Sequence, residues 1–329
     1  MLKDMMPHFD LYQPDSVEAA VDLAARLGED GWLLGAGQDS FDWLKNRTKR
    51  TPAVIDLGGI AALKGVREHE GGIEIGALTT LSDIEQHALV KEKFGLLAKA
   101  AGRVASPQIR NAGTLGGNLC QDTRCWYYRH GVDCYRAGGN MCYADTPEGQ
   151  NREHAIFGAS RCVAVQPSDT ANAIVALEGS MVVRSAKGER VIPAVQFFVG
   201  PAVDIRRMTV LEPGDILVAV RIPAKWAGAT FYFEKVADRN VWDFALVSIA
   251  AALKLDGGKI TDASLVCGAV GAVPWRLTAV QAAIRGSTKD EATAERAGKL
   301  AADGAKPLNF NHYKIPLMEN LVRRAIRDA

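Results

Sequence analysis

The stretch NAGTLGGNL (111–119) holds three glycines, one threonine and two asparagines within nine residues. We predict a tight loop here, because glycine in this number disfavours a helix. Such a loop can approach a flat ring or a pyrophosphate closely, with Gly117 at the closest approach, while Thr114 and Asn118 supply hydrogen bonds. A purely structural turn would explain the same residues.

A second glycine-containing stretch, LGAGQDS (34–40), continues an apolar segment that predicts a short buried strand. A strand that opens into closely spaced glycines can bring backbone N–H groups against a phosphate. The candidate binding residues are Leu34, Gly35, Ala36, Gly37, Gln38, Asp39 and Ser40. The stretch lacks the third glycine of the dinucleotide-binding pattern and the Gly-Lys-Ser/Thr of a P-loop, so a plain strand–turn–helix corner is the competing interpretation.

A third candidate lies in QPSDTANA (166–173). Ser168 or Asp169 can cap the helix that we predict after Pro167, because short polar side chains satisfy the first free N–H groups of a helix. A carboxylate at this position can instead hold a ribityl or ribose hydroxyl.

The cysteines are unevenly distributed, since five of the six fall between positions 120 and 162 and Cys267 stands apart. Four of them are separated by eight, seven and nineteen residues: Cys125, Cys134, Cys142 and Cys162. This spacing matches neither a zinc ribbon nor the compact ferredoxin run. The segment also contains five arginines and no lysine, and positive charge would offset the negative charge of an iron–sulfur cluster. A zinc site and four unrelated buried thiols are the alternatives.

Composition excludes several classes of protein. The 39 basic and 38 acidic residues nearly balance, which gives no reason to expect a nucleic-acid or membrane partner. No apolar run reaches the roughly 18 residues of a transmembrane helix. The N-terminal sequence MLKDMMPHFDLYQPDS lacks the apolar core of a signal peptide, so we expect a cytoplasmic protein.

The remaining pattern mixes helix and strand signals and predicts an α+β fold with a domain boundary near residue 225. Predicted helices are 14–30, capped by Asp15 or Ser16, then 93–106 and 276–286, with another that starts at Ser82 and has Glu85 at capping-box spacing. Predicted strands lie within 32–37, 53–57, 71–76, 161–166, 180–194, 212–223 and 229–237, and a strand pair turns at 256–258. Residues 120–162 are expected to form a loop excursion.

Taken together, these segments resemble the medium, FAD-binding subunit of the xanthine dehydrogenase family. The resemblance covers nearly the whole chain. Six segments come in the family's order: the loop at 34–40, IDLGGIAALKGV (55–66), GGIEIGALTTLSDIE (71–85), QIRNAGTLGGNL (108–119), PSD (167–169) and FEKVADRNVWDFALVSIAAAL (233–253). Gln38-Asp39 departs from the Gly-Thr or Gly-Ser that many relatives have there.

The resemblance implies a two-lobed FAD-binding domain of the vanillyl-alcohol oxidase type over residues 1–225, with lobes of about 1–60 and 61–225. A C-terminal α+β domain like that of carbon monoxide dehydrogenase flavoproteins would cover 226–329. By the family pattern, the loops at 34–40 and 111–118 grip FAD, Asp169 lies beside the flavin, and Lys235 lies near the isoalloxazine edge. No residue of this chain is assigned a catalytic role on substrate.

The cysteine segment resembles an insertion found in 4-hydroxybenzoyl-CoA reductase β subunits and in the FAD subunits of bacterial periplasmic aldehyde oxidoreductases, where it holds a [4Fe–4S] cluster. The family's four ligands fall on Cys125, Cys134, Cys142 and Cys162, whereas Cys120 is outside the ligand pattern. Cys120 should point toward the flavin domain, and Cys267 should be a small buried apolar residue.

The resemblance also implies partners: a small subunit with [2Fe–2S] clusters, a large subunit with molybdopterin, and ferredoxin or another external electron carrier. Export with a partner subunit would offer a route to the periplasm. The alternatives are a β subunit of a 4-hydroxybenzoyl-CoA reductase, a stand-alone flavin oxidase and a zinc-stabilised interaction protein.

Overall fold

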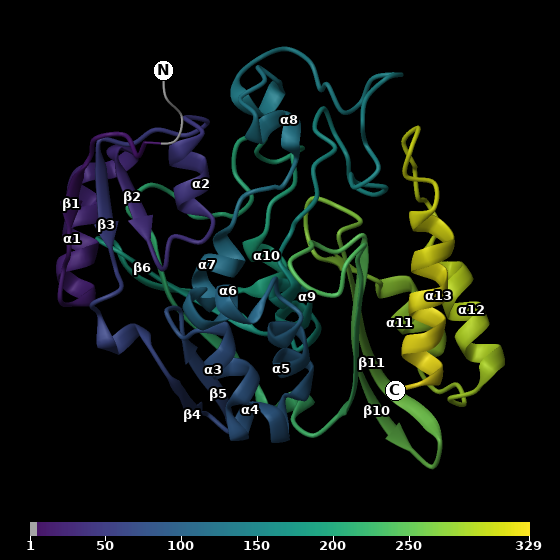
Figure 1. Cartoon of the computed structure of the whole chain (residues 1–329). Helices are drawn as coiled ribbons and strands as arrows, with labels where there is room; N and C mark the ends of the chain where they lie inside the picture. The colour runs from purple at the N-terminus through teal and green to yellow at the C-terminus, as the bar shows by residue number, and fades with distance from the viewer. Residues whose placement is uncertain (1–4) are drawn as a thin grey trace.

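Three β-sheets organise the computed structural model, which describes residues 5–329 (Figure 1). The first sheet is parallel, in the order β1–β3–β2: β1 (Asp10–Tyr12), β2 (Gly31–Leu34) and β3 (Ala53–Asp56). The second is antiparallel, in the order β4–β5–β8–β6–β7: β4 (Val66–His69), β5 (Gly72–Gly76), β6 (Ser180–Ser185), β7 (Gly188–Pro193) and β8 (Ile216–Ile222). The third, also antiparallel, has the order β12–β11–β10–β9: β9 (Thr230–Val236), β10 (Val247–Asp256), β11 (Lys259–Gly268) and β12 (Trp275–Arg276).

The second sheet is covered on both faces. One core joins Val17 and Ala20 of α1 (Val17–Leu27) to Val182 of β6 and Val218 of β8. A larger core on the other face includes side chains of six helices: α3 (Leu81–Gln86), α4 (Ala88–Lys93), α5 (Gly95–Gly102), α7 (Leu115–Cys120), α9 (Asp169–Ala176) and α10 (Ala194–Phe197). The second sheet therefore packs against α1 on one face and against the central helices on the other.

The third sheet connects this framework to the C-terminal helices. Ala250 and Val266 belong to the large central core. Ile249 and Leu265 belong to a separate core shared with the helices that lie beside β10 and β11 (Figure 1). Those helices are α11 (Thr278–Ile284), α12 (Glu291–Ala301) and α13 (Lys314–Arg327). None of the helices described is long and apolar enough to cross a membrane.

Local sequence signals predict many of these elements correctly. Ser16 caps α1, since its hydroxyl accepts a hydrogen bond from the Ala19 N–H. The predicted turn at 256–258 joins β10 to β11, where Asp256 pairs with Lys259. Residues 120–162 are largely irregular, with only α8 (Trp126–Arg129) and a 3₁₀ turn over 135–137. The observed fold is α+β, as expected.

The prediction that 110–119 forms a loop is wrong. Two short helices, α6 (Pro107–Ala112) and α7, occupy this region and leave only Gly113 and Thr114 between them. Ser106 caps α6, whose first residue is proline, and Thr114 caps α7 by accepting a hydrogen bond from the Gly117 N–H. Two good caps and tertiary packing outweigh the poor helix propensity of the glycines.

Two further local predictions are also wrong. Helix α3 is capped by Thr80 and not by Ser82, and Asp83 completes the reciprocal pair of hydrogen bonds with Thr80. The strand expected at 161–166 is absent from the described chain, where this segment has only an isolated bridge between Ser160 and Cys162. Residues 1–4 of the expected first lobe lie outside the described residues.

Candidate functional site

A cleft of about 540 Å³ lies between the end of β2, the turn before α7, the start of α9 and strand β9. This volume is within the range of small-molecule and cofactor sites. Eleven of the predicted binding residues line the cleft: Gly35, Ala36, Gly37, Gln38, Asp39, Ser40, Thr114, Gly117, Asn118, Asp169 and Lys235. Leu34 is the exception, because its side chain is buried where β2 pairs with β3.

The loop after β2 packs directly on the cap of α7. Gly37 has a φ of 80°, and a side chain there would collide with the ring of Phe41. A Cβ atom on Gly35 would lie 3.0 Å from the Thr114 Oγ1 atom. Glycine at 35 therefore lets the first loop close against the second glycine segment, and glycine at 37 lets the chain turn into the following helix beside Phe41.

Thr114 and Asn118 are engaged within the protein. The Thr114 hydroxyl accepts the 3.1 Å hydrogen bond from the Gly117 N–H. The Asn118 Oδ1 atom accepts hydrogen bonds from the Ser168 hydroxyl at 2.6 Å and from the Thr170 hydroxyl at 2.5 Å. Thr114 thus fixes the start of α7 at the wall of the cleft, and Asn118 connects α7 to the start of α9, whose cap is Ser168.

Asp39 is surrounded by protein donors. Its Oδ1 atom accepts hydrogen bonds from Arg124 at 2.9 Å and Arg129 at 3.1 Å. Its Oδ2 atom accepts from the Trp43 indole at 2.9 Å and from the Asp122 N–H at 3.3 Å. The carboxylate therefore connects the first glycine loop to the start of the cysteine segment.

A second set of ion pairs reinforces this connection. Lys49 and Arg136 both pair with the buried Asp122, and Arg129 also pairs with Asp42. Burial alone would raise the pKa of Asp122, but Arg136 and Lys49 hold that pKa below its usual value. The Lys49–Asp122 and Arg129–Asp42 pairs span 73 and 87 residues of sequence, so local patterns carry no signal for them, whereas Arg136 and Asp122 lie 14 residues apart within the cysteine segment.

Asp169 and Lys235 form a buried ion pair at one wall of the cleft. The Lys235 Nζ atom donates to the Asp169 Oδ2 atom at 2.6 Å and to the Arg103 carbonyl at 3.1 Å. Burial raises the pKa of the Asp169 carboxyl, and the Lys235 ammonium offsets part of that rise. The pair joins a residue of α9 to a residue of β9 at one wall of the cleft.

Several cleft residues were not singled out from the sequence. They are aromatic or charged: Trp32, Trp43, Lys49, Asp122, Trp242, Asp243 and Phe244. The Arg124 guanidinium lies over the Phe244 ring at 4.6 Å from its centre, and the Lys49 ammonium lies 4.9 Å from the centre of a Trp43 ring. In the sequence, Trp242 and Phe244 of the 233–253 segment were the signal that could have identified aromatic residues of the cleft.

The four predicted cluster ligands line one small internal cavity: Cys125, Cys134, Cys142 and Cys162. Tyr128 and Arg136 line the same cavity, and Cys134 packs with Trp43 and Tyr128 in a small apolar core. Burial, reinforced by the other three sulfurs, raises the pKa of the Cys125 thiol to about 12. Cys120 lines the large cleft instead, and Cys267 is fully buried in β11, both in agreement with the predicted positions.

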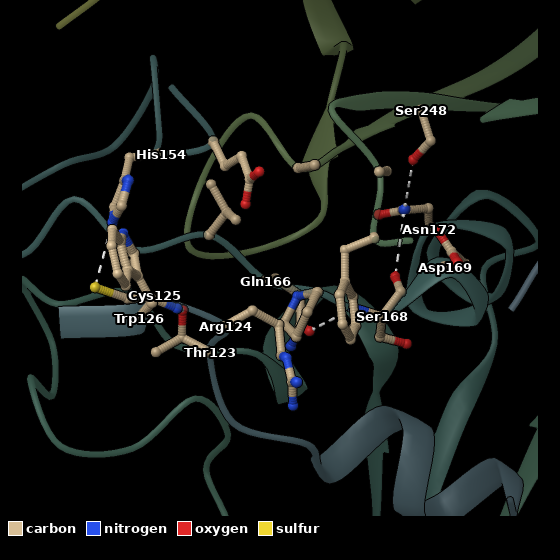
Figure 2. A pocket seen from close by; sticks show the side chains of 16 residues that line it. Thr123, Arg124, Cys125, Trp126, His154, Gln166, Ser168, Asp169, Asn172 and Ser248 are labelled. Carbon is tan, nitrogen blue, oxygen red and sulfur yellow. Dashed lines mark hydrogen bonds between the residues drawn. The ribbon is translucent and has the colours of Figure 1, made fainter. Parts of the chain in front are cut away.

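A third cavity lies between the cysteines and the large cleft (Figure 2). Cys125 and His154 line it on one side, and Ser168, Asp169 and Asn172 line it on the other. The His154 Nε2 atom is 3.2 Å from the Cys125 sulfur. Burial lowers the pKa of His154 to about 4, so its ring is neutral at physiological pH.

Two family models match consecutive parts of the chain. The FAD binding domain in molybdopterin dehydrogenase matches residues 7–225, and the carbon monoxide dehydrogenase flavoprotein C-terminal domain matches residues 232–329. An aldehyde oxidoreductase FAD-binding subunit of Escherichia coli K12 is 33% identical over 97% of each chain. A carbon monoxide dehydrogenase medium chain of Hydrogenophaga pseudoflava is 27% identical over 98% of this chain and 97% of its own.

Solved structures agree with these matches. Carbon monoxide dehydrogenase from Hydrogenophaga pseudoflava superposes with a TM-score of 0.78 and 26% identity, covering 98% of this chain and 97% of the other. Quinoline 2-oxidoreductase from Pseudomonas putida 86, at 24% identity and a TM-score of 0.77, shares the fold over 99% of this chain and 98% of its own. Because the FAD-binding family model spans most of the chain and these similarities extend over nearly its full length, the chain belongs to the FAD-binding medium subunits of the molybdenum hydroxylases.

Proposed function

We propose that this chain is the electron-transfer flavoprotein subunit of a molybdenum hydroxylase that oxidises aldehydes. The main support is the cleft, which gathers residues of five separate segments, 35–40, 114–118, 169, 235 and 242–244, around one volume of cofactor size. The aldehyde assignment rests on the 33% identity with an aldehyde oxidoreductase FAD-binding subunit.

The cleft residues fit FAD in chemical character. Gly117 is exposed at the cleft surface, so the backbone there can approach a pyrophosphate or a ring. The buried Asp169–Lys235 pair fixes opposite charges at the wall that the flavin ring would contact. Bound FAD would supply single-electron exchange with clusters and two-electron exchange with an external carrier.

The cysteine cavity supports a second cofactor, a [4Fe–4S] cluster held by Cys125, Cys134, Cys142 and Cys162. Four thiols around one cavity provide a complete ligand set for a cubane. Within residues 5–329, no three His, Cys, Asp or Glu side chains converge closely enough for a single metal ion, which disfavours the zinc alternative because zinc needs all its ligands around one point. A cubane spreads its ligands over separate iron atoms. The buried Arg136 would offset the negative charge of such a cluster.

The proposed partners would supply the steps to which no residue of this chain is assigned. We assign no residue of the chain to substrate activation, so a molybdopterin subunit would oxidise the aldehyde and a [2Fe–2S] subunit would carry electrons to this chain. Ferredoxin or another carrier would accept them. The purified single chain should therefore reduce an artificial dye with aldehydes hardly at all, and robust turnover by the single chain would favour a stand-alone oxidase.

Iron and sulfide analysis of anaerobically purified protein tests the cluster assignment. Each single Cys→Ser change at the four proposed ligands should lower the iron content, whereas Cys120→Ser and Cys267→Ser should retain about four irons per chain. Loss of the cluster in Cys120→Ser together with its retention in Cys162→Ser would move the ligand set toward the N-terminus. Stoichiometric zinc in place of iron would support the interaction-protein alternative.

The β subunit of a 4-hydroxybenzoyl-CoA reductase is the second candidate within the same family. The stretch NLCQDTRC (118–125) resembles the reductase and favours it, whereas GQNREHAIFGASRCVAVQPSD (149–169) and VPWRL (273–277) resemble the aldehyde enzymes more. The direction of electron flow in the purified complex separates the two. Reduction of a dye by aldehydes supports the hydroxylase, and dye-driven reduction of an aromatic acyl-CoA supports the reductase.

A further inference from the structure

The small cavity between the cysteines and the large cleft, which we call the bridging cavity, has polar side chains on two sides, with Cys125 and His154 on one and Ser168, Asp169 and Asn172 on the other. It has a volume of about 40 Å³. A buried water needs roughly 10–15 Å³ by this measure, so there is room for up to about three water molecules. Its other walls are largely apolar, with Val165, Pro167 and Ala269 among the lining residues.

Three buried polar atoms of this lining have no hydrogen-bond partner in the described part of the chain: the Nδ1 atom of His154, the Nε2 atom of Gln166 and the Oδ1 atom of Asn172. The last two belong to neutral side-chain amides. Gln166 is 3% exposed and Asn172 is 2% exposed, so bulk solvent does not reach either side chain freely. Buried amide groups are nearly always paired with protein or with ordered water, because leaving them unpaired costs stability.

In each side-chain amide, the hydrogen bond made by the paired atom fixes the orientation of the unpaired atom. The Ser168 N–H donates to the Gln166 Oε1 atom at 2.9 Å. The Asn172 Nδ2 atom donates to the Ser168 carbonyl oxygen at 3.4 Å and to the Ser248 hydroxyl at 3.2 Å; the hydroxyl contact is drawn in Figure 2. Because a carbonyl oxygen only accepts, its bond fixes which end of the Asn172 amide is the NH₂ group. A flip of Gln166 would set its NH₂ group against the Ser168 N–H, so the free group of Gln166 is a donor and that of Asn172 an acceptor.

The backbone beside Asn172 is shaped to keep this arrangement. A Cβ atom on Gly268 would overlap both the Asn172 Nδ2 atom and the Ser248 hydroxyl. Glycine at 268 therefore lets β10 and β11 present Ser248 to Asn172, and this contact turns the Asn172 carbonyl to its unpaired position.

We propose that the bridging cavity binds ordered water, which accepts a hydrogen bond from the Gln166 Nε2 atom and donates one to the Asn172 Oδ1 atom. Water matches the site because both unpaired groups are neutral, one donates and one accepts, and the volume admits nothing much larger. The water forms a hydrated link between the Cys125 side and Asp169, which lines both this cavity and the large cleft. This site needs neither cofactor to exist.

A crystal structure of the purified protein or its complex at better than about 1.8 Å tests the site directly. Density for water within hydrogen-bond distance of both the Gln166 Nε2 and Asn172 Oδ1 atoms is the expected result. A dry cavity, or amides rearranged onto protein partners, would overturn the proposal. Because the assignment concerns water alone, this result is independent of iron content and FAD occupancy.

A double-mutant cycle gives a second test in solution. Gln166→Met and Asn172→Leu each remove one partner of the shared water, so the double variant should lose less folding stability than the two singles predict. The shortfall should be about twofold to a hundredfold in the folding equilibrium constant. Gln281→Met is the matched control, because its Nε2 atom is also unpaired among the described residues but Gln281 does not line this cavity. In the control cycle, Gln281→Met is combined with Asn172→Leu, and the two stability losses should add. If the losses of Gln166→Met and Asn172→Leu add just as fully, the shared water is refuted.

Discussion

The Asp39 carboxylate is the main connection between the first glycine loop and the cysteine segment, and Asp39→Asn tests its importance. The substitution keeps the shape of the side chain but leaves one acceptor oxygen where there were two. Two of the four donors around Asp39 consequently lose their acceptor. We expect the variant to loosen both the cofactor cleft and the cysteine segment.

The magnitude follows from the contacts. Hydrogen bonds to a charged group contribute about 1.5–3 kcal/mol each, and the carboxylate is 21% exposed, which moderates the loss. Arg124 keeps its contact with Phe244, and Arg129 keeps its ion pair with Asp42. We therefore expect a net loss of about 2–3 kcal/mol in the free energy that holds the two segments together.

This loss should appear in FAD affinity, because the cofactor would bind only when the first loop is in place. A loss of about 2–3 kcal/mol corresponds to an increase of up to about 100-fold in the FAD dissociation constant. Fluorescence titration of apoprotein with FAD measures this constant. Limited proteolysis of residues 120–162 should show faster cleavage in the same variant.

Asp42→Asn is the matched control. Asp42 also pairs with Arg129, but its side chain is 50% exposed, so this pair should contribute less than about 1 kcal/mol. Coupling between two binding sites is reciprocal. Removal of FAD should therefore lower the affinity of the four cysteines for the proposed cluster by the same factor as loss of that cluster lowers the affinity for FAD. FAD affinity within about twofold of wild type in Asp39→Asn, with unchanged proteolysis, would refute the reasoning.

Three other substitutions have distinct expected outcomes. Gly117→Val should lower FAD affinity by at least about tenfold, measured by bound flavin absorbance, because the new side chain crowds the Thr114 hydroxyl at the cleft surface; full flavin occupancy would contradict this. Lys235→Met should lower the free energy of unfolding by about 3–5 kcal/mol at neutral pH, because the buried Asp169 carboxylate loses its partner. The loss should be smaller in acid, because the pKa of Asp169 rises further and protonation removes the buried charge. Urea unfolding measures both values, and a pH-independent loss would contradict the prediction. Burial lowers the pKa of Lys314 to about 7. Between about pH 7 and 10 the unfolded chain therefore binds one more proton at this side chain than the folded chain, and the free energy of unfolding of the wild type should rise by about 1.4 kcal/mol per pH unit. Lys314→Met should remove this slope, which urea unfolding at several pH values measures.

Local chemistry made part of the fold predictable. Ser16, placed just before an amphipathic stretch, marks the start of α1, and the glycines at 257–258 mark the turn between β10 and β11. These signals act within a few residues, so no tertiary information is needed. The spacing of the four cysteines left a zinc site and unrelated thiols open, and only the resemblance grouped them as one ligand set; the structure places all four around one cavity.

The errors arise where tertiary contacts override local preference. The glycine content of 110–119 predicted a loop, yet the caps Ser106 and Thr114 and the packing of α7 produce two helices. Long-range contacts also escape local patterns: Asp39, which lines the cleft and stays a predicted binding residue, has partners 83 to 90 residues away in Asp122, Arg124 and Arg129. Such partners can be found only once the chain has folded.

The glycines of the α7 region illustrate how structure separates packing from binding. A Cβ atom on Gly116 would lie 3.0 Å from the Ala77 carbonyl oxygen, a tight contact, so glycine at 116 favours close packing of α7 against the chain after β5. Gly117 is exposed, and among the described atoms its Cβ would approach only the Thr114 hydroxyl. Adjacent glycines in one motif thus serve different purposes. Gly116 positions the helix, and Gly117 leaves the cleft surface open for a cofactor, which is why the affinity test is directed at Gly117.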